Sequence, residues 1–164
     1  MDLLDGLNPL QKQAVQAFEG PILVHAGPGS GKTRVITHRI AYLVTQHRVN
    51  PRYILAVTFS RKAAGEMQKR LEDLLKDSAR HLTVGTFHSV CLAILRKEGV
   101  PGFGTSFDVV DDDAQTKLVK KCIDRAGYEL NGQDLRRIKS AISFAKCSMI
   151  DPDAFVPKQG ERLD

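Results

Sequence analysis

The residues best suited to chemistry form a glycine-rich run between an apolar segment and a helical pattern. In order, the run is Ala26, Gly27, Pro28, Gly29, Ser30, Gly31, Lys32 and Thr33. Because glycine lacks a Cβ atom, the backbone can turn its N–H groups inward around phosphate oxygens. Lys32 offers a positive charge for the outer phosphates, Thr33 a hydroxyl for Mg²⁺, and the following helix points its positive end at the same anion. The run therefore predicts a P-loop that binds a nucleoside triphosphate with Mg²⁺.

One position of this run departs from the usual P-loop pattern. The pattern begins with glycine, and Ala26 stands there in this chain. We interpret the departure as the mark of a subtype. The simpler alternative is a turn that only joins a strand to a helix, but three glycines, a lysine and a threonine in this order argue against it.

Catalysis at a P-loop also needs a carboxylate at the end of a neighbouring strand, to hold Mg²⁺ through water. The only candidates are the consecutive acids Asp111, Asp112 and Asp113. They directly precede an amphipathic helix, whose N-terminus attracts carboxylates, so we favour helix capping over a metal site. The sequence thus predicts that the catalytic carboxylate pair is missing.

Short apolar runs alternate with helical patterns along the first part of the chain. We expect strands at about 22–25, 53–57 and 82–86, and helices at about 9–18, 32–46, 61–75 and 89–98. Asn8 should cap the first helix together with Gln11. The order predicts an α/β fold, in which a parallel sheet has helices on both faces and the carboxyl ends of its strands share one rim.

A dense Pro/Gly stretch at residues 99–104 indicates a boundary between residues 1–99 and 100–164. The second part is mainly helical, with helices expected at about 114–126 and 134–146 and no predictable structure after residue 150. We expect Leu118 and Cys122 to be buried in the first of these helices. All three cysteines, Cys91, Cys122 and Cys147, fit reduced core thiols better than disulfides or zinc ligands.

Composition and charge favour a soluble globular protein over a membrane or secreted protein. Apolar residues make up 42% and charged residues 26% of the chain, as in soluble globular proteins. No run is long enough to span a membrane and the N-terminus lacks a signal peptide's basic start, so we expect a cytoplasmic protein. Residues 1–99 hold 14 Lys and Arg against 8 Asp and Glu, whereas residues 100–164 hold 10 against 11. This excess is consistent with a polyanionic partner, and equally with plain solubility.

Four blocks of sequence together resemble the UvrD/Rep/PcrA family of superfamily 1 DNA helicases, in that family's order and spacing. They are Leu7–Val15, Ala26–Leu43, Ile54–Met67 and Thr83–Arg96. Ala26 matches what the family carries, and residues 107–121 resemble the start of its helical insertion. The resemblance implies a RecA-like P-loop NTPase domain that uses ATP and Mg²⁺. It also implies 3′ to 5′ movement on single-stranded DNA and unwinding at single/double-strand junctions, with DNA repair among the possible settings.

The resemblance also implies roles for individual residues. Gln11 would read the adenine edge, in addition to its capping role. Arg34 would stack its guanidinium group on the adenine ring. The alternative is that Arg34 is an ordinary solvent-exposed arginine on the helix. Two sets would contact single-stranded DNA: Thr58, Phe59, Arg61 and Lys62, and then Thr86, Phe87, His88 and Ser89. Aromatic rings can stack on unpaired bases while hydroxyl and basic groups hold phosphates. Alternatively, the two phenylalanines are core residues and His88 caps a helix.

The family's acidic DExx motif, its arginine contacts to the outer phosphate and its second RecA-like domain have no counterpart here. In the family's usual Thr-Asn positions this chain has Ser60 and Arg61. The chain therefore resembles an N-terminal fragment of a helicase, and we expect it not to unwind DNA alone. Two alternatives stay open: a P-loop phosphotransferase acting on a small molecule, and a noncatalytic nucleotide-binding module.

Overall fold

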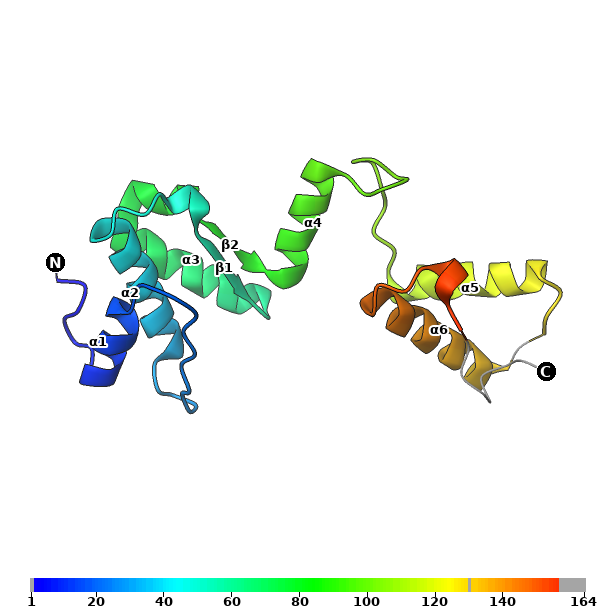
Figure 1. Cartoon of the computed structure of the whole chain (residues 1–164), viewed down its shortest axis with the longest axis horizontal. Helices are drawn as coiled ribbons and strands as arrows, with labels where there is room; N and C mark the ends of the chain where they lie inside the picture. The colour runs from blue at the N-terminus through cyan, green and yellow to red at the C-terminus, as the bar shows by residue number, and fades with distance from the viewer. Residues whose placement is uncertain (1, 130, 157–164) are drawn as a thin grey trace. The chain divides into compact units, whose positions relative to one another are not determined.

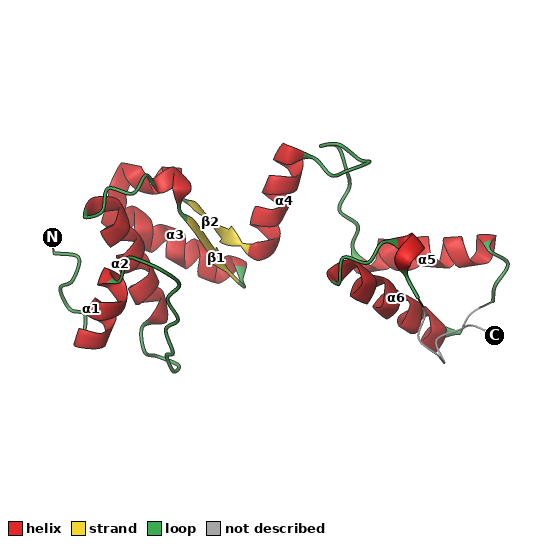
Figure 2. Cartoon of the chain, in the orientation of Figure 1, coloured by secondary structure: helices red, strands yellow, loops and turns green. Residues whose placement is uncertain are grey.

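Figures 1 and 2 show the computed structural model, which describes residues 2–129 and 131–156. The chain divides into two compact units, with the boundary between Ser106 and Phe107. The sequence places this boundary a few residues earlier, in the Pro/Gly stretch. That stretch instead forms a tight turn at the end of the first unit, in which the N–H of Val100 donates to the carbonyl oxygen of Gly104 at 2.7 Å.

Two parallel strands form the sheet of the first unit. β1 spans Leu55–Thr58 and β2 spans Thr83–Thr86, and Thr58 lies opposite Thr86 in the register. The connection between them consists of helix α3, Arg61–Leu75, and the 3₁₀ helix η2, Lys76–His81. This is the βαβ arrangement that the sequence predicts, and it puts the carboxyl ends of both strands side by side.

The main core lies between this sheet and helices α2, Lys32–Thr45, and α3 (Figure 2). Its buried members are Ile40, Ala41, Ala56, Met67, Leu71, Leu75, Ala79 and Leu82. Helix α4, Phe87–Glu98, leaves the end of β2 so closely that a Cβ atom at Gly85 would lie 2.8 Å from the Ser89 hydroxyl oxygen. Glycine at position 85 therefore permits the approach of α4 to the strand.

Helix α1, Pro9–Gln16, packs separately on α2 through a small cluster of Leu7, Val15 and Val35. As predicted, Asn8 and Gln11 form a capping box. The Asn8 side chain accepts from the backbone N–H of Gln11 at 2.9 Å, and the Gln11 side chain accepts from the backbone N–H of Asn8 at 3.0 Å. The start of α1 is thereby fixed by local side-chain bonds.

The predicted strand at residues 22–25 is wrong. Within the part of the chain that the structure describes, no backbone hydrogen bond joins residues 21–26 to β1 or β2, and the segment runs as a loop. Leu23 is 80% exposed. A strand needs a neighbour for its N–H and C=O groups, and an apolar run does not say which strand provides one. The sheet therefore has two strands where the sequence predicts three.

The second unit contains helices α5, Asp112–Arg125, and α6, Gly132–Cys147, with a short 3₁₀ helix η3 at Pro152–Ala154. Asp111 caps α5, accepting from the backbone N–H of Ala114 at 2.8 Å, as the capping interpretation predicts. Lys139 of α6 donates to the Asp112 carboxylate at 2.7 Å and to the Thr116 hydroxyl at 2.8 Å, which joins the two helices. Of the segment predicted to be irregular, residues 157–164 lie outside the described part.

Burial predictions for several helix residues are also wrong. All three cysteines are exposed, and Leu118 is 55% exposed. An apolar helical pattern indicates a helix, but only tertiary packing decides how much of its apolar face is covered. No described helix is long and apolar enough to cross a membrane.

Candidate nucleotide-binding site and strand-end surface

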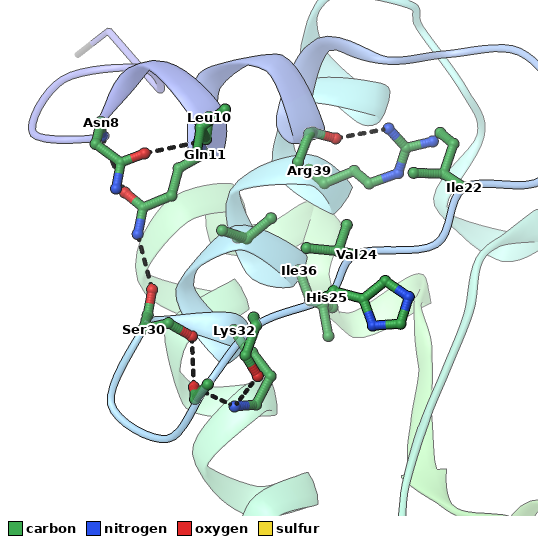
Figure 3. Close-up of a pocket in the computed structure, with 14 residues that line it drawn as sticks. Asn8, Leu10, Gln11, Ile22, Val24, His25, Ser30, Lys32, Ile36 and Arg39 are labelled. Carbon is green, nitrogen blue, oxygen red and sulfur yellow. Dashed lines mark hydrogen bonds between the residues drawn. The ribbon is translucent and has the colours of Figure 1, made fainter.

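A cavity of about 510 Å³ lies between α1, the glycine-rich loop and the start of α2 (Figure 3). Part of its lining is apolar, namely Leu10, Ala14, Ile22, Val24, Val35 and Ile36. Polar groups come from Asn8, Gln11, His25, Ser30, Lys32 and Arg39, together with the backbone of Ala26 and Gly27. A mostly apolar pocket with a few polar groups is the usual form of a small-molecule site.

The glycine-rich loop takes backbone conformations that only glycine adopts easily. Gly29 has φ of 73° and Gly31 has φ of 83°, and α2 begins at the next residue without a side-chain cap. Because the first N–H groups of a helix have no partner within it, they and the positive helix end remain available for an anion. This is the loop-to-helix junction that phosphate binding requires.

The polar side chains of the loop bond to the loop itself. Lys32 donates from Nζ to the carbonyl oxygens of Ala26 at 3.1 Å and Gly27 at 2.7 Å. Ser30 donates from Oγ to the Gly27 carbonyl oxygen at 2.7 Å. The loop thus holds its one ammonium group against its own backbone, close to where the chain turns (Figure 3).

Gln11 connects α1 to the loop. While its Oε1 serves the capping box, its Nε2 donates to the carbonyl oxygen of Ser30 at 3.0 Å. A Cβ atom at Gly31 would lie 3.0 Å from the same Nε2, so glycine at that position leaves room for the amide. The predicted base-reading residue and the predicted phosphate loop are therefore in direct contact.

The two arginines of α2 make different contacts. Arg34 is not among the residues that line the cavity, and its Nη2 donates to the carbonyl oxygen of Asp5 at 3.4 Å. Arg39 lines the cavity and was not singled out from the sequence. Its spacing could have identified it, because Lys32, Ile36 and Arg39 follow at i, i+4 and i+7 and so share one helix face.

The residues predicted to contact DNA stand at the paired ends of β1 and β2. Phe59 and Phe87 each follow one member of the Thr58–Thr86 pair and are 90% and 57% exposed. Neither ring is a core residue. Arg61, Lys62 and His88 are exposed in the first turns of α3 and α4. We call Phe59, Arg61, Lys62, Phe87 and His88 the strand-end surface.

The side chains of Thr86 and Ser89 form a capping box at the start of α4. The N–H of Ser89 donates to the Thr86 hydroxyl at 3.2 Å, and the N–H of Thr86 donates to the Ser89 hydroxyl at 2.9 Å. Thr86 is only 7% exposed. These two side chains therefore shape the strand-end surface, while the exposed residues around them are free to meet a ligand.

The described residues form no cluster of metal-binding side chains. Among residues 2–129 and 131–156, no three His, Cys, Asp or Glu side chains gather closely enough to hold a metal ion. Thr33, the predicted Mg²⁺ ligand, is the first residue after Lys32 in α2 and is half-buried.

Comparisons with known proteins all match this chain to DNA helicases of one family. A family model described as the UvrD/REP helicase N-terminal domain matches residues 7–163. The ATP-dependent DNA helicase PcrA of Bacillus subtilis (strain 168) is 42% identical over 163 residues, which are 99% of this chain and 22% of the relative. PcrA of Leuconostoc citreum is 47% identical over 152 residues, or 92% of this chain and 20% of the relative.

A third relative, the ATP-dependent DNA helicase UvrD1 of Mycobacterium tuberculosis (strain ATCC 25618 / H37Rv), is 43% identical over 152 residues. That alignment covers 92% of this chain and 20% of the relative. The chain therefore spans about a fifth of the length of the curated relatives it matches.

Proposed function

The chain belongs to the family of UvrD/REP helicase N-terminal domains, and we propose that it binds ATP with Mg²⁺ in the cavity between α1 and α2 as part of a DNA helicase. The first compact unit then forms the first part of a RecA-like ATP-binding domain, and the second unit begins its helical insertion. The observation that carries the proposal is the direct contact of Gln11 with the loop that contains Lys32.

The phosphates lie on the glycine-rich loop in this proposal. Lys32 leaves the carbonyl oxygens of Ala26 and Gly27 and donates to the outer phosphate oxygens. Its ammonium group makes a stronger hydrogen bond to a charged phosphate than to a neutral carbonyl. The N–H groups of Gly29, Gly31, Lys32 and Thr33 add further donors, and the positive end of α2 favours the anion. Thr33 would offer its hydroxyl to Mg²⁺, which would neutralise charge on the phosphates.

The base lies toward α1. Gln11 reads the adenine edge through its amide, which can both donate and accept. The apolar side chains Leu10, Ile22 and Val24 give the ring a surface to pack on. Arg34 stacks on the adenine only after its guanidinium leaves the carbonyl oxygen of Asp5, so its contribution depends on a movement of that side chain.

The strand-end surface binds single-stranded DNA. Phe59 and Phe87 stack on bases, while Arg61, Lys62 and His88 hold phosphates without reading sequence. The capping box of Thr86 and Ser89 fixes the start of α4, and Thr58 lies opposite Thr86 in the sheet. The exposure of both rings at adjacent strand ends supports this assignment.

The complete motor moves 3′ to 5′ along single-stranded DNA and unwinds duplex at junctions. ATP binding and hydrolysis alternately close and open its two motor domains, which steps the strand-end surface along the DNA. The described ends of β1 and β2 carry threonine and phenylalanine and no acid. We therefore assign ATP and DNA binding to this chain and not the cleavage of the phosphate bond.

ATP turnover tests the proposal when it is measured with and without single-stranded DNA, for this chain and for the product of its complete gene. We expect strong stimulation by DNA in the gene product. Turnover that ignores DNA would favour a small-molecule phosphotransferase. ATP binding without turnover in either sample would favour a noncatalytic module.

A further inference from the structure

Arg39 bonds to the C-terminal end of α1, although it belongs to α2. Its Nη1 donates to the carbonyl oxygen of Ala14 at 3.1 Å and also to that of Ala17. Ala17 is the C-cap residue of α1, and the last turn of α1 has no basic side chain of its own. Because the last carbonyls of a helix lack partners within it, Arg39 supplies both the donor and the positive charge that this end needs.

Helix α1 is short enough to need such a contact. It has eight residues, and helices of that length are marginal unless tertiary contacts hold them. The only fully buried side chain of α1 is Val15, and Leu10 is 77% exposed. The other long-range bonds from α2 reach the segment before α1, since His38 contacts the Leu3 carbonyl oxygen at 2.7 Å and Arg34 that of Asp5.

Gln11 lies near the other end of the same helix. Its amide meets the loop at Ser30, so α1 is attached to the P-loop side of the molecule at both ends, by Gln11 and by Arg39 (Figure 3). Arg39 also lines the cavity two turns along α2 from Lys32. A shift of α1 along or away from α2 would therefore move Gln11 relative to the phosphate loop.

We propose that Arg39 is a positioning residue, which fixes α1 so that Gln11 stands at the distance from the P-loop that recognition of adenine requires. This inference rests on the proposed function, because it assumes that the base lies at Gln11. Arg39 acts through the Ala14 and Ala17 carbonyl oxygens and not by touching the nucleotide. Since Nη1 alone makes both bonds, a lysine ammonium at position 39 can replace much of its effect.

The test is the discrimination between bases, measured by isothermal titration on the full chain. The ligands are ATP, GTP and inorganic tripolyphosphate, each with Mg²⁺. The variants are Arg39→Gln, Arg39→Met, Arg39→Lys, Gln11→Ala and the double variant Gln11→Ala/Arg39→Gln. Arg70→Gln is the matched control, because Arg70 is exposed on α3 and does not line the cavity.

We expect Arg39→Gln and Arg39→Met to lower the preference for ATP over GTP about tenfold, the loss that one hydrogen bond to the base would give. Affinity for tripolyphosphate should stay within about twofold of wild type. The double variant should lose no more preference than Gln11→Ala, because both changes act on the same contact. Arg39→Lys should restore most of the preference, and Arg70→Gln should keep all of it.

Several results would overturn the inference. An unchanged preference for ATP over GTP in Arg39→Gln would show that α1 keeps its position without Arg39. Equal losses of affinity for ATP and for tripolyphosphate would show that Arg39 stabilises the whole first unit and does not act on base recognition. Additive losses in the double variant would mean that Arg39 contacts the base by itself. Failure of both Arg39→Gln and Arg39→Met to fold would assign the residue to folding.

Failure of the proposed function gives a different pattern, visible in the wild type alone. Wild-type protein that binds neither ATP nor tripolyphosphate would overturn the P-loop assignment. Binding of both without preference over GTP would retain the P-loop and remove the role of Gln11 in reading the base, and the inference about Arg39 with it.

Discussion

The cavity and the strand-end surface are built in different ways. The cavity contains side chains that bond to backbone groups far away in the sequence, as Gln11 does with Ser30 and Arg39 with Ala14, besides the local bonds of its loop. Around the strand-end surface the side-chain bonds are local. Thr86 and Ser89 bond to each other, and Ser60 caps its own helix by accepting from the N–H of Ala63 at 3.1 Å.

This difference matches the two ligands we propose. A nucleotide is compact, so its recognition gains from groups that are already held in place by long-range contacts. Single-stranded DNA is flexible and is bound without reading its sequence. Exposed aromatic rings and charged side chains on well-ordered helix and strand ends are therefore sufficient to bind it. The contrast predicts that substitutions will separate into those that affect ATP, those that affect DNA and those that affect folding.

The largest effect is expected from the main core between the sheet and helices α2 and α3. Leu71 is fully buried, so Leu71→Ala should lower the free energy of unfolding by about 2–5 kcal/mol, through lost burial and the cavity left behind. Leu23→Ala, in the exposed segment before the glycine-rich loop, is the matched control and should change the free energy of unfolding by less than about 0.5 kcal/mol. Urea denaturation measures both. Equal losses would mean that the segment at residues 22–25 is packed after all.

Lys32→Ala should weaken ATP binding by about 1.5–3 kcal/mol, or roughly 10- to 150-fold in Kd, because a charged hydrogen-bond donor to the phosphates is lost. Affinity for single-stranded DNA should not change. Lys69→Ala, in the exposed part of α3, is the control for loss of one positive charge. Titration calorimetry follows ATP and fluorescence anisotropy follows labelled DNA. Unchanged ATP affinity would refute the P-loop assignment.

Phe59→Ala should weaken binding of single-stranded DNA by about 1–3 kcal/mol, the contribution of one stacked base. Phe87→Ala should have a smaller effect, since its ring is 57% exposed against 90% for Phe59. ATP affinity should be retained in both variants. Phe103, 71% exposed in the turn after α4, provides the control Phe103→Ala. A loss in the control as large as in Phe59→Ala would remove the assignment of DNA to the strand ends.

Thr86→Ala should lower stability by about 1 kcal/mol through loss of the cap on α4. DNA affinity should change by less than about twofold, because the side chain is already bonded to Ser89. Thermal unfolding and anisotropy together check this, with Thr83→Ala, exposed in β2, as the control. A DNA defect comparable with that of Phe59→Ala would make Thr86 a direct contact.

Local rules made much of the fold predictable from the sequence. The capping box of Asn8 and Gln11 depends only on spacing, and so does the start of α3 after Ser60. The strands β1 and β2 follow from short apolar runs with a helical pattern between them. The P-loop stays a prediction from its residue types, and the structure adds that Gln11 contacts the same loop at Ser30.

What escaped prediction depends on how distant parts of the chain pack. The segment at residues 22–25 has a strand's composition but lacks a strand's pairing, which is a long-range property. The bonds of Arg39 exist only because α1 lies across α2, and nothing in the spacing of Arg39 shows that it reaches Ala14. The exposure of Cys91 likewise reflects how little covers the outer face of α4.

The bonds of Lys32 to the loop carbonyls carry a consequence for the strength of ligand binding. Two of the three donors of the ammonium group are engaged by the carbonyl oxygens of Ala26 and Gly27. Nucleotide entry is then an exchange of hydrogen-bond partners, in which phosphate oxygens compete with these carbonyl oxygens. Because an exposed side chain reorients within picoseconds to nanoseconds, this competition lowers the net gain from phosphate binding and leaves the association rate unchanged.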